Sequence, residues 1–386
     1  MAAIPSRVLT LVLVIALTTL ICLSILVLEP GERVLSFLDR NSPPAQVPIS
    51  IGTDRILPVP SHTYIVHLAR RTDRRREMER LRKLLGVEWS YIRAEESDSP
   101  LIDQLMSGIR KLRTDALAEN GYAGDKHNTT VSLPFTWPDD HARMSFTPFE
   151  KEDKSTPGDV EFLDDIQPEE EQDPMTCTMG DFNLTPYSPK LAEVRTLTRS
   201  RVACFRSHFA AIRHAATRAP DAIPHASLFF EDDIDMESDI QERLASVWPY
   251  LPADWDLVFL GHGWGNETRY AALGPPSPYA STHIHPSNAP LCTHAYALSA
   301  KGVQHVLRHL AYEPFAYSRP IDNALAWLII SGRIKSYSVA PSVVVQRKKD
   351  VSDVLKGVHY KIRYSWDHLD RGVLAQADAA KMADWN

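Results

Sequence analysis

The chain has 386 residues, 44% of them hydrophobic and 24% charged, which is the composition of an ordinary globular protein with room for one large domain or two average ones. Its formal net charge is −7, and residues 150–173 alone hold eleven acidic side chains, so the rest is close to neutral and no nucleic-acid surface is implied. The four cysteines show no C-x-x-C spacing, which argues against a zinc site and a dense disulfide framework but leaves one bridge open.

The N-terminal region predicts a membrane anchor. Residues 8–28 contain no charged side chain, and 21 such residues are enough for a helix to cross a bilayer. No small-x-small cleavage site follows, so we expect an uncleaved signal anchor within residues 1–29, with a cleaved signal peptide as the alternative. Arg7 precedes the segment and two glutamates follow it, which favours a cytoplasmic N-terminus. The expected topology is a single-pass type II membrane protein of the Golgi or endoplasmic reticulum with its bulk in the lumen.

Three N-x-S/T triplets agree with a luminal location, since such triplets are glycosylation acceptors in secreted chains. They begin at Asn128, Asn183 and Asn266. Residues 30–60 are rich in Pro and Ser and suit an extended stem. The folded domain is therefore expected to span residues 61–386.

A strand, a helix and a second strand open this domain. Residues 63–68 form a compact apolar run, a helix with one apolar face ends at Gly86, and residues 87–94 again read as a strand. This order is typical of α/β sheets with nucleotide crevices. Four arginines follow the first strand, where guanidinium groups could bind a diphosphate, although an exposed basic helical turn is the simpler interpretation. They are Arg70, Arg71, Arg74 and Arg75.

Regular patterning is lost over residues 122–189, which are rich in Pro, Ser, Thr and acidic residues and are predicted to be a partly disordered insertion. Residues 196–218 resume a helical pattern with one apolar face. Ser207, a candidate for donor binding, and His208 lie inside this helix. A lone histidine in such a place is more often a hydrogen-bonded structural residue than a catalyst.

The strongest signal for a site is the stretch 228–235, in which an apolar run ends in four carboxylates within five residues. A strand here would carry Glu231, Asp232 and Asp233 to its carboxyl end, where open α/β sheets bind ligands. Crowded carboxylates repel one another unless a cation joins them, so a Mg²⁺ or Mn²⁺ site for a diphosphate is plausible. The simpler interpretation is a solvated turn in which Asp233 or Asp235 caps a helix that begins near Met236.

The remaining elements continue the α/β pattern. Strands are expected at 255–260, 291–298 and 338–346, and helices before Pro249, at 301–310 and after Pro320. Three glycines between Gly261 and Gly265 permit a close backbone approach to a ligand but match no phosphate-binding fingerprint. Asp322 falls near the start of the last helix, where capping is the simpler role.

The blocks in this order resemble family-25 glycosyltransferases, the group of lipopolysaccharide-biosynthesis and procollagen galactosyltransferases. Four segments carry the resemblance: the opening strand with its basic turn, the V-A-C-F-R-S-H block, the F-E-D-D-I strand end and the W-D-L-V-F-L-G strand. They are residues 64–75, 202–208, 230–234 and 255–261, followed by 293–299 and 320–323. Ala203 stands where the family has glycine, and His67 where it has a polar amide.

The resemblance implies a GT-A-like, Rossmann-like α/β sheet with helices on both faces and a nucleotide-sugar donor, which we expect to be a UDP-sugar. It also implies a divalent metal, Mn²⁺ or Mg²⁺, held by Glu231, Asp232 and Asp233. The implied reaction moves a sugar, galactose in some members, to a hydroxyl of a glycan or glycoprotein with inversion. Asp322 is the first candidate for its general base and His208 the second.

Two other function classes remain open at this point. A luminal binding or adhesion protein could keep the fold without catalysis, since fold does not imply function. A metal-dependent hydrolase would also use a carboxylate cluster, because metals held by carboxylates activate water.

Overall fold

The computed structural model describes residues 55–119, 130–138, 174–190, 193–217, 226–279, 281–347 and 368–383. All of them belong to one compact unit, Pro48–Asn386. The predicted membrane helix and most of the predicted stem lie outside these segments. Within them, no helix combines the length and the apolar character that a membrane span needs.

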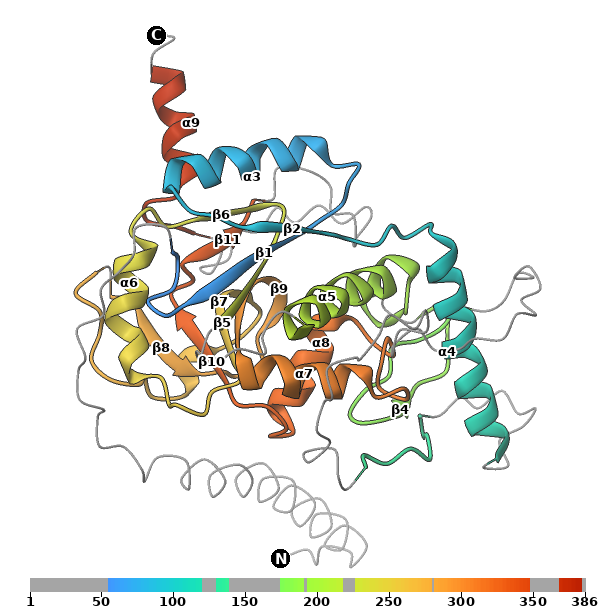
Figure 1. Cartoon of the computed structure of the whole chain (residues 1–386). Helices are drawn as coiled ribbons and strands as arrows, with labels where there is room; N and C mark the ends of the chain where they lie inside the picture. The colour runs from blue at the N-terminus through green and yellow to red at the C-terminus, as the bar shows by residue number, and fades with distance from the viewer. Residues whose placement is uncertain are drawn as a thin grey trace, which may run out of the picture. The chain divides into compact units, whose positions relative to one another are not determined.

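A mixed seven-stranded sheet forms the centre of this unit (Figure 1). Its strand order is β2-β1-β5-β9-β7-β10-β8. Strands β1, β2 and β5 are parallel to one another, as are β7 and β10, whereas β9 runs antiparallel between β5 and β7. The strands are β1 Ser61–His67, β2 Ser90–Arg93, β5 Ala226–Glu231, β7 Leu257–Gly263, β8 His283–Pro286, β9 Leu291–Ser299 and β10 Ser336–Ala340. The carboxyl ends of β1, β5 and β7 therefore meet at one edge.

Helices cover both faces of the sheet, because its strands are apolar on both sides. Side chains alternate along β5: Phe229 packs with the layer of α4, α5, α7 and α8, and Phe230 with the layer of α3, α6 and α9. The helices are α3 Thr72–Leu85, α4 Pro100–Glu119, α5 Arg199–Thr217, α6 Ile240–Val247, α7 Ala300–Ala311, α8 Ile321–Ile330 and α9 Val373–Ala383. The predicted α/β class with helices on both faces is confirmed.

Two small antiparallel pairs accompany the central sheet. The first joins β6 Ile234–Met236 to β11 Val344–Gln346, and the second joins β3 Val131–Ser132 to β4 Asn183–Leu184. The second pair joins two stretches of the predicted insertion. The helix considered near Met236 is absent, because β6 occupies that place and α6 begins only at Ile240. Likewise the single strand predicted at 338–346 is two strands, β10 and β11, interrupted at the cis Ala340-Pro341 bond.

Buried arginines hold the chain that follows the acidic run onto the helical layer. The Arg113 guanidinium donates to the carbonyl of Thr176, at 2.7 Å, and to that of Ser318, at 3.1 Å. Arg319 donates to the carbonyls of Gly180 and Asp181. A carbonyl group carries no formal charge, so these contacts give the two guanidinium groups no counter-ion. Burial lowers the pKa of Arg319 to about 9. Within the described segments, no disulfide joins Cys177, Cys204 and Cys292 to one another.

Candidate functional site

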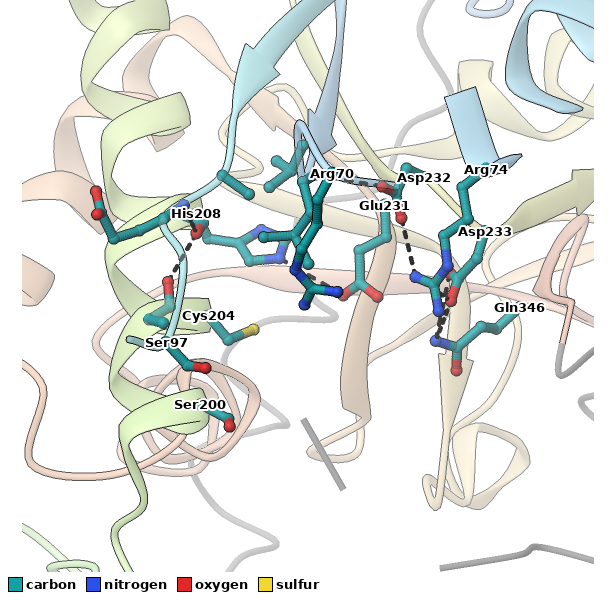
Figure 2. Close-up of a pocket in the computed structure, with 16 residues that line it drawn as sticks. Arg70, Arg74, Ser97, Ser200, Cys204, His208, Glu231, Asp232, Asp233 and Gln346 are labelled. Atoms are coloured by element: carbon teal, nitrogen blue, oxygen red, sulfur yellow. Dashed lines mark hydrogen bonds and ion pairs between the residues drawn. The ribbon is translucent and has the colours of Figure 1, made fainter. Parts of the chain in front are cut away.

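A cavity of about 110 Å³ opens where β1 and β5 end, at the edge predicted from the sequence (Figure 2). It is lined from the end of β1, the start of α3, the loop after β2, the helix α5, the end of β5 and the end of β11. Of the predicted site residues, those that line it are Arg70, Arg74, Ser207, His208, Glu231, Asp232 and Asp233. Small-molecule pockets are usually larger, at roughly 300–1,000 Å³, so this cavity suits the charged part of a ligand.

The guanidinium of Arg74 lies between the two aspartates of this cavity (Figure 2). Its Nη1 is 3.0 Å from Asp232 Oδ1 and 2.9 Å from Asp233 Oδ2. Asp232 is buried, and its other oxygen accepts from the backbone N–H of Leu68, at 3.3 Å, and contacts His67 Nδ1 at 2.8 Å. Asp232 is therefore fixed by the end of β1 as well as by its own strand.

Asp233 faces the cavity with less compensation than Asp232. Its carboxylate accepts from the amide of Gln346 at 3.1 Å, in addition to Arg74. Burial, with the charges of Glu231 and Asp232 nearby, raises the pKa of Asp233 to about 7 despite the arginine. A second positive charge would therefore be stabilised here.

Two side chains contact Glu231, the hydroxyl of Thr293 and the imidazole of His208. Thr293 Oγ1 donates to Glu231 Oε1 at 2.9 Å, and His208 Nε2 lies 3.5 Å from the same oxygen. Although burial alone would raise its pKa, the contact with His208 keeps the pKa of Glu231 below the ordinary value. His208 is itself buried and its Nδ1 is 3.0 Å from the hydroxyl of Tyr296. This histidine, predicted as the second candidate base, is thus placed to hold Glu231.

The four predicted arginines do not act as one group. Arg70 lines the cavity and pairs with Glu96 at 2.8 Å, so it joins Arg74 at the site. Arg71 pairs instead with Asp73, and Arg75 stacks on a tyrosine, its Cζ 3.5 Å from the ring centre of Tyr91. Neither of these two lines the cavity. Arg70 and Arg74 are four residues apart, as are Arg71 and Arg75, and the start of α3 places these two pairs on different sides.

Ser207 shapes the cavity wall from α5. Its hydroxyl accepts from the backbone N–H of Glu95 at 2.9 Å and donates to the carbonyl of Ala203 at 2.7 Å. The serine therefore fixes the loop after β2 against α5.

Asp322 is close to the cavity without lining it. It lies in the first turn of α8, where Oδ1 accepts from the backbone N–H of Asn323 at 2.8 Å and Oδ2 from that of Cys292 at 3.3 Å. Burial, and further the charge of Glu231, raises the pKa of Asp322 above its ordinary value. A carboxylate with a raised pKa is a stronger base, so the placement is compatible with the predicted role.

The fourth carboxylate of the acidic stretch has a structural role. Asp235 turns away into β6 and accepts from the backbone N–H groups of Leu374, at 2.9 Å, and Ala375, at 3.1 Å. Asp235 thereby accepts from the N–H groups at the start of α9, which have no acceptor within that helix. The capping interpretation, which placed a helix near Met236, is wrong, because β6 lies there.

The glycine loop also differs from the expectation. A Cβ on Gly261 would lie 2.2 Å from the carbonyl oxygen of Val344 and 2.3 Å from His294 Nε2. The close approach that this glycine permits is to β11 and β9, not to a ligand. It allows β11 to bring Gln346 to Asp233.

The carboxylates pass a chemical test for a divalent cation, with one qualification. Their oxygens are the hard ligands that Mg²⁺ and Mn²⁺ prefer. Burial, and further the charges of the neighbouring carboxylates, raises the pKa of Asp233, so a bound cation would stabilise its charged form. At present Arg74 fills the space between Asp232 and Asp233. In the segments the structure describes, no three Asp, Glu, His or Cys side chains already surround a common point. A cation would therefore compete with the arginine for the same oxygens.

Sequence reasoning did not identify two functional candidates. His67 was noted only as a departure from the family pattern, yet it contacts Asp232 directly. Gln346 was assigned to the end of a strand and contacts Asp233. The signal available for His67 was its place at the end of β1, beside the predicted acidic strand end. Gln346 offered no signal, since only β11 brings it there.

Comparison with known proteins points to one family over about a third of the chain. No known protein-family profile matches the chain. It is 31% identical over 144 residues to proteins named "Probable inactive glycosyltransferase 25 family member 3" in Bos taurus and "Inactive glycosyltransferase 25 family member 3" in Homo sapiens. A Rattus norvegicus protein named "Probable inactive glycosyltransferase 25 family member 3" is 28% identical over 144 residues.

These matches cover 36% of the chain and only 21% or 22% of each relative, so the chain spans about a fifth of the length of the curated relatives it matches. The resemblance inferred from the sequence motifs is confirmed at this level: the similar proteins are family-25 members.

Proposed function

We propose that the cavity is the donor site of a glycosyltransferase with a GT-A-like fold, which moves a sugar from a nucleotide-sugar to a hydroxyl of a glycan or glycoprotein. One observation carries the proposal. Arginines from the end of β1 and carboxylates from the end of β5 meet in one cavity at the carboxyl edge of an α/β sheet. The similarity to family-25 proteins supports the same assignment.

The reaction needs charge stabilisation on the leaving group and a base for the acceptor. Arg70 and Arg74 supply guanidinium groups that bind diphosphate oxygens. Asp233 and Asp232 would hold a Mn²⁺ or Mg²⁺ ion, which when bound neutralises negative charge on the departing diphosphate. Asp322 would take the proton of the acceptor hydroxyl on the side opposite the diphosphate, in an inverting transfer. The proposed donor is a UDP-sugar, with galactose as the first sugar to test.

A non-catalytic protein with the same fold is the second candidate, and two observations favour it. The similar relatives are named inactive. In addition, the Arg74 guanidinium already lies between the two aspartates, in the place that a bridging metal would take. Such a protein would bind a glycan or a nucleotide-sugar in the lumen without transferring the sugar.

Incubation of the purified full chain with a panel of nucleotide-sugars and Mn²⁺ separates these candidates. A transferase is expected to release nucleoside diphosphate and to do so faster when a hydroxyl acceptor is added. A binding protein would show saturable donor binding with no release. Release of nucleoside monophosphate or inorganic phosphate would identify a metal-dependent hydrolase and refute both.

The proposed location is the lumen of the Golgi or endoplasmic reticulum, with residues 1–29 as anchor. Protease added to intact microsomes should then leave residues 61–386 undigested, and the same protease with detergent should degrade them. Two of the three sequon asparagines, Asn183 and Asn266, are exposed and could carry glycans. Digestion without detergent would contradict this topology.

A further inference from the structure

The sheet edge beside the carboxylates carries an exposed tryptophan. Trp264 follows β7 directly, and 52% of its surface is accessible. Gly263 pairs with Leu291 at the start of β9, and β9 pairs in turn with β5. Phe230 pairs with Ala295, so Glu231 lies about four residues further along β9 than the position that faces Trp264. With strands about 4.8 Å apart and a rise of about 3.3 Å per residue, the backbone at Trp264 is roughly 16 Å from the strand end that carries Glu231. That separation leaves room for a transferred sugar and an acceptor ring between them.

The backbone at this edge is unusually strained. Trp264, Ala289 and Cys292 have φ values of 60°, 53° and 69°, in the left-handed region that residues other than glycine rarely adopt. They make up three of the five such residues in the described segments, and they come together where β7 ends and β9 begins. Each such conformation costs on the order of 1–3 kcal/mol and persists only where the surroundings impose it. We call residues 263–267 and 288–293 the β7–β9 rim.

Two carboxylates hold the rim in this conformation. Glu267 is buried and its Oε2 accepts from the backbone N–H of Asn288 at 2.7 Å, which ties the two parts of the rim together. Asp322 Oδ2 accepts from the N–H of Cys292 at 3.3 Å. Gly265 packs so closely that an added Cβ would lie 2.4 Å from Glu267 Oε1. These contacts therefore hold the backbone at Trp264 in place without a bound ligand.

From this arrangement we infer that Trp264 is a stacking platform for a pyranose ring of the acceptor, an inference that rests on the proposed transferase function. A pyranose presents a face of C–H groups, and the face of an indole ring is large, apolar and electron-rich. The rim also contacts Asp322 through Cys292, so a ring on Trp264 would have its hydroxyls beside the proposed base. The platform thus determines which acceptors place a hydroxyl next to Asp322.

Saturation-transfer NMR tests the contact directly. The probes are the methyl glycosides of galactose, glucose, mannose and xylose, added to the full chain in detergent. Wild type should transfer saturation to the C–H protons of one face of at least one sugar. Trp264→Phe should keep most of the signal and Trp264→Ala should lose it. Tyr279→Ala, which removes another exposed aromatic ring in the loop before β8, should behave as wild type. Absence of transfer in wild type, or equal transfer in Trp264→Ala, refutes the platform.

Kinetics separate this inference from the proposed function. In an active transferase, Trp264→Ala should raise the acceptor KM about tenfold, while nucleoside diphosphate release without acceptor is unchanged. Turnover with an unchanged acceptor KM would refute the platform and leave the transferase function standing. Tryptophan-dependent sugar contact without any nucleoside diphosphate release would refute the transferase function and leave Trp264 as a glycan-binding residue.

Discussion

Replacement of Asp322 by asparagine should lower kcat by at least about a hundredfold, with donor affinity little changed. A positioned general base contributes on the order of 10²- to 10⁴-fold, and an amide cannot take a proton. Asparagine keeps the size of the side chain and one acceptor oxygen for Asn323 or Cys292. The structural cost should be only about 1 kcal/mol, from one lost hydrogen bond. Steady-state kinetics and donor titration measure the two effects separately.

Asp235→Asn is the matched control, since it makes the same substitution in a carboxylate that also accepts backbone N–H groups, three of them, but lies outside the cavity. It should lower the melting temperature and leave kcat unchanged. If Asp322→Asn retains near-normal kcat, then Asp322 serves only to hold Cys292 and the start of α8. His208 would then be the base to test, through the pH dependence of kcat.

Turnover should vanish in chelator and return with Mn²⁺ or Mg²⁺, and Asp233→Asn should abolish it in either metal. The reason is that Asp233 is buried beside Glu231 and Asp232, so a bound cation would stabilise its charged form. Because Arg74 binds the same oxygens, Arg74→Met should tighten Mn²⁺ binding measured by calorimetry without donor. Full activity in chelator would exclude the metal, and Arg74 would then be the cation that neutralises this site.

The same carboxylate predicts a dependence of stability on pH. The pKa of Asp233 is about 7 in the folded chain, against an ordinary value of 3.8. The folded state therefore binds more protons than the unfolded state between about pH 4 and pH 7, and this contribution to stability is lost as the pH rises through 7. Metal-free Asp233→Asn should accordingly melt at a higher temperature than wild type at pH 8 and at a similar one at pH 4. A lower melting temperature at pH 8 would show that the Arg74 contact outweighs the cost of burial.

Local patterns determined most of the elements and the location of the site. Short continuous apolar runs predicted β1, β5, β7 and β9, and helical periodicity with Gly86 as a stop predicted α3. The position of Glu231 at the end of a buried strand was sufficient to predict a cavity there, because parallel strands end at a common edge.

What each carboxylate does was decided only by the tertiary structure. Asp232, Asp233 and Asp235 are the same residue type, but their contacts differ. Asp232 contacts His67 and Arg74, Asp233 contacts Gln346, and Asp235 contacts the start of α9. These partners lie about 110 to 165 residues away in the sequence. The strength of a charge interaction depends on the distance in space and on burial, and sequence separation encodes neither. For the same reason the sequence showed four equivalent arginines, and only the fold separated Arg70 and Arg74 from the other two.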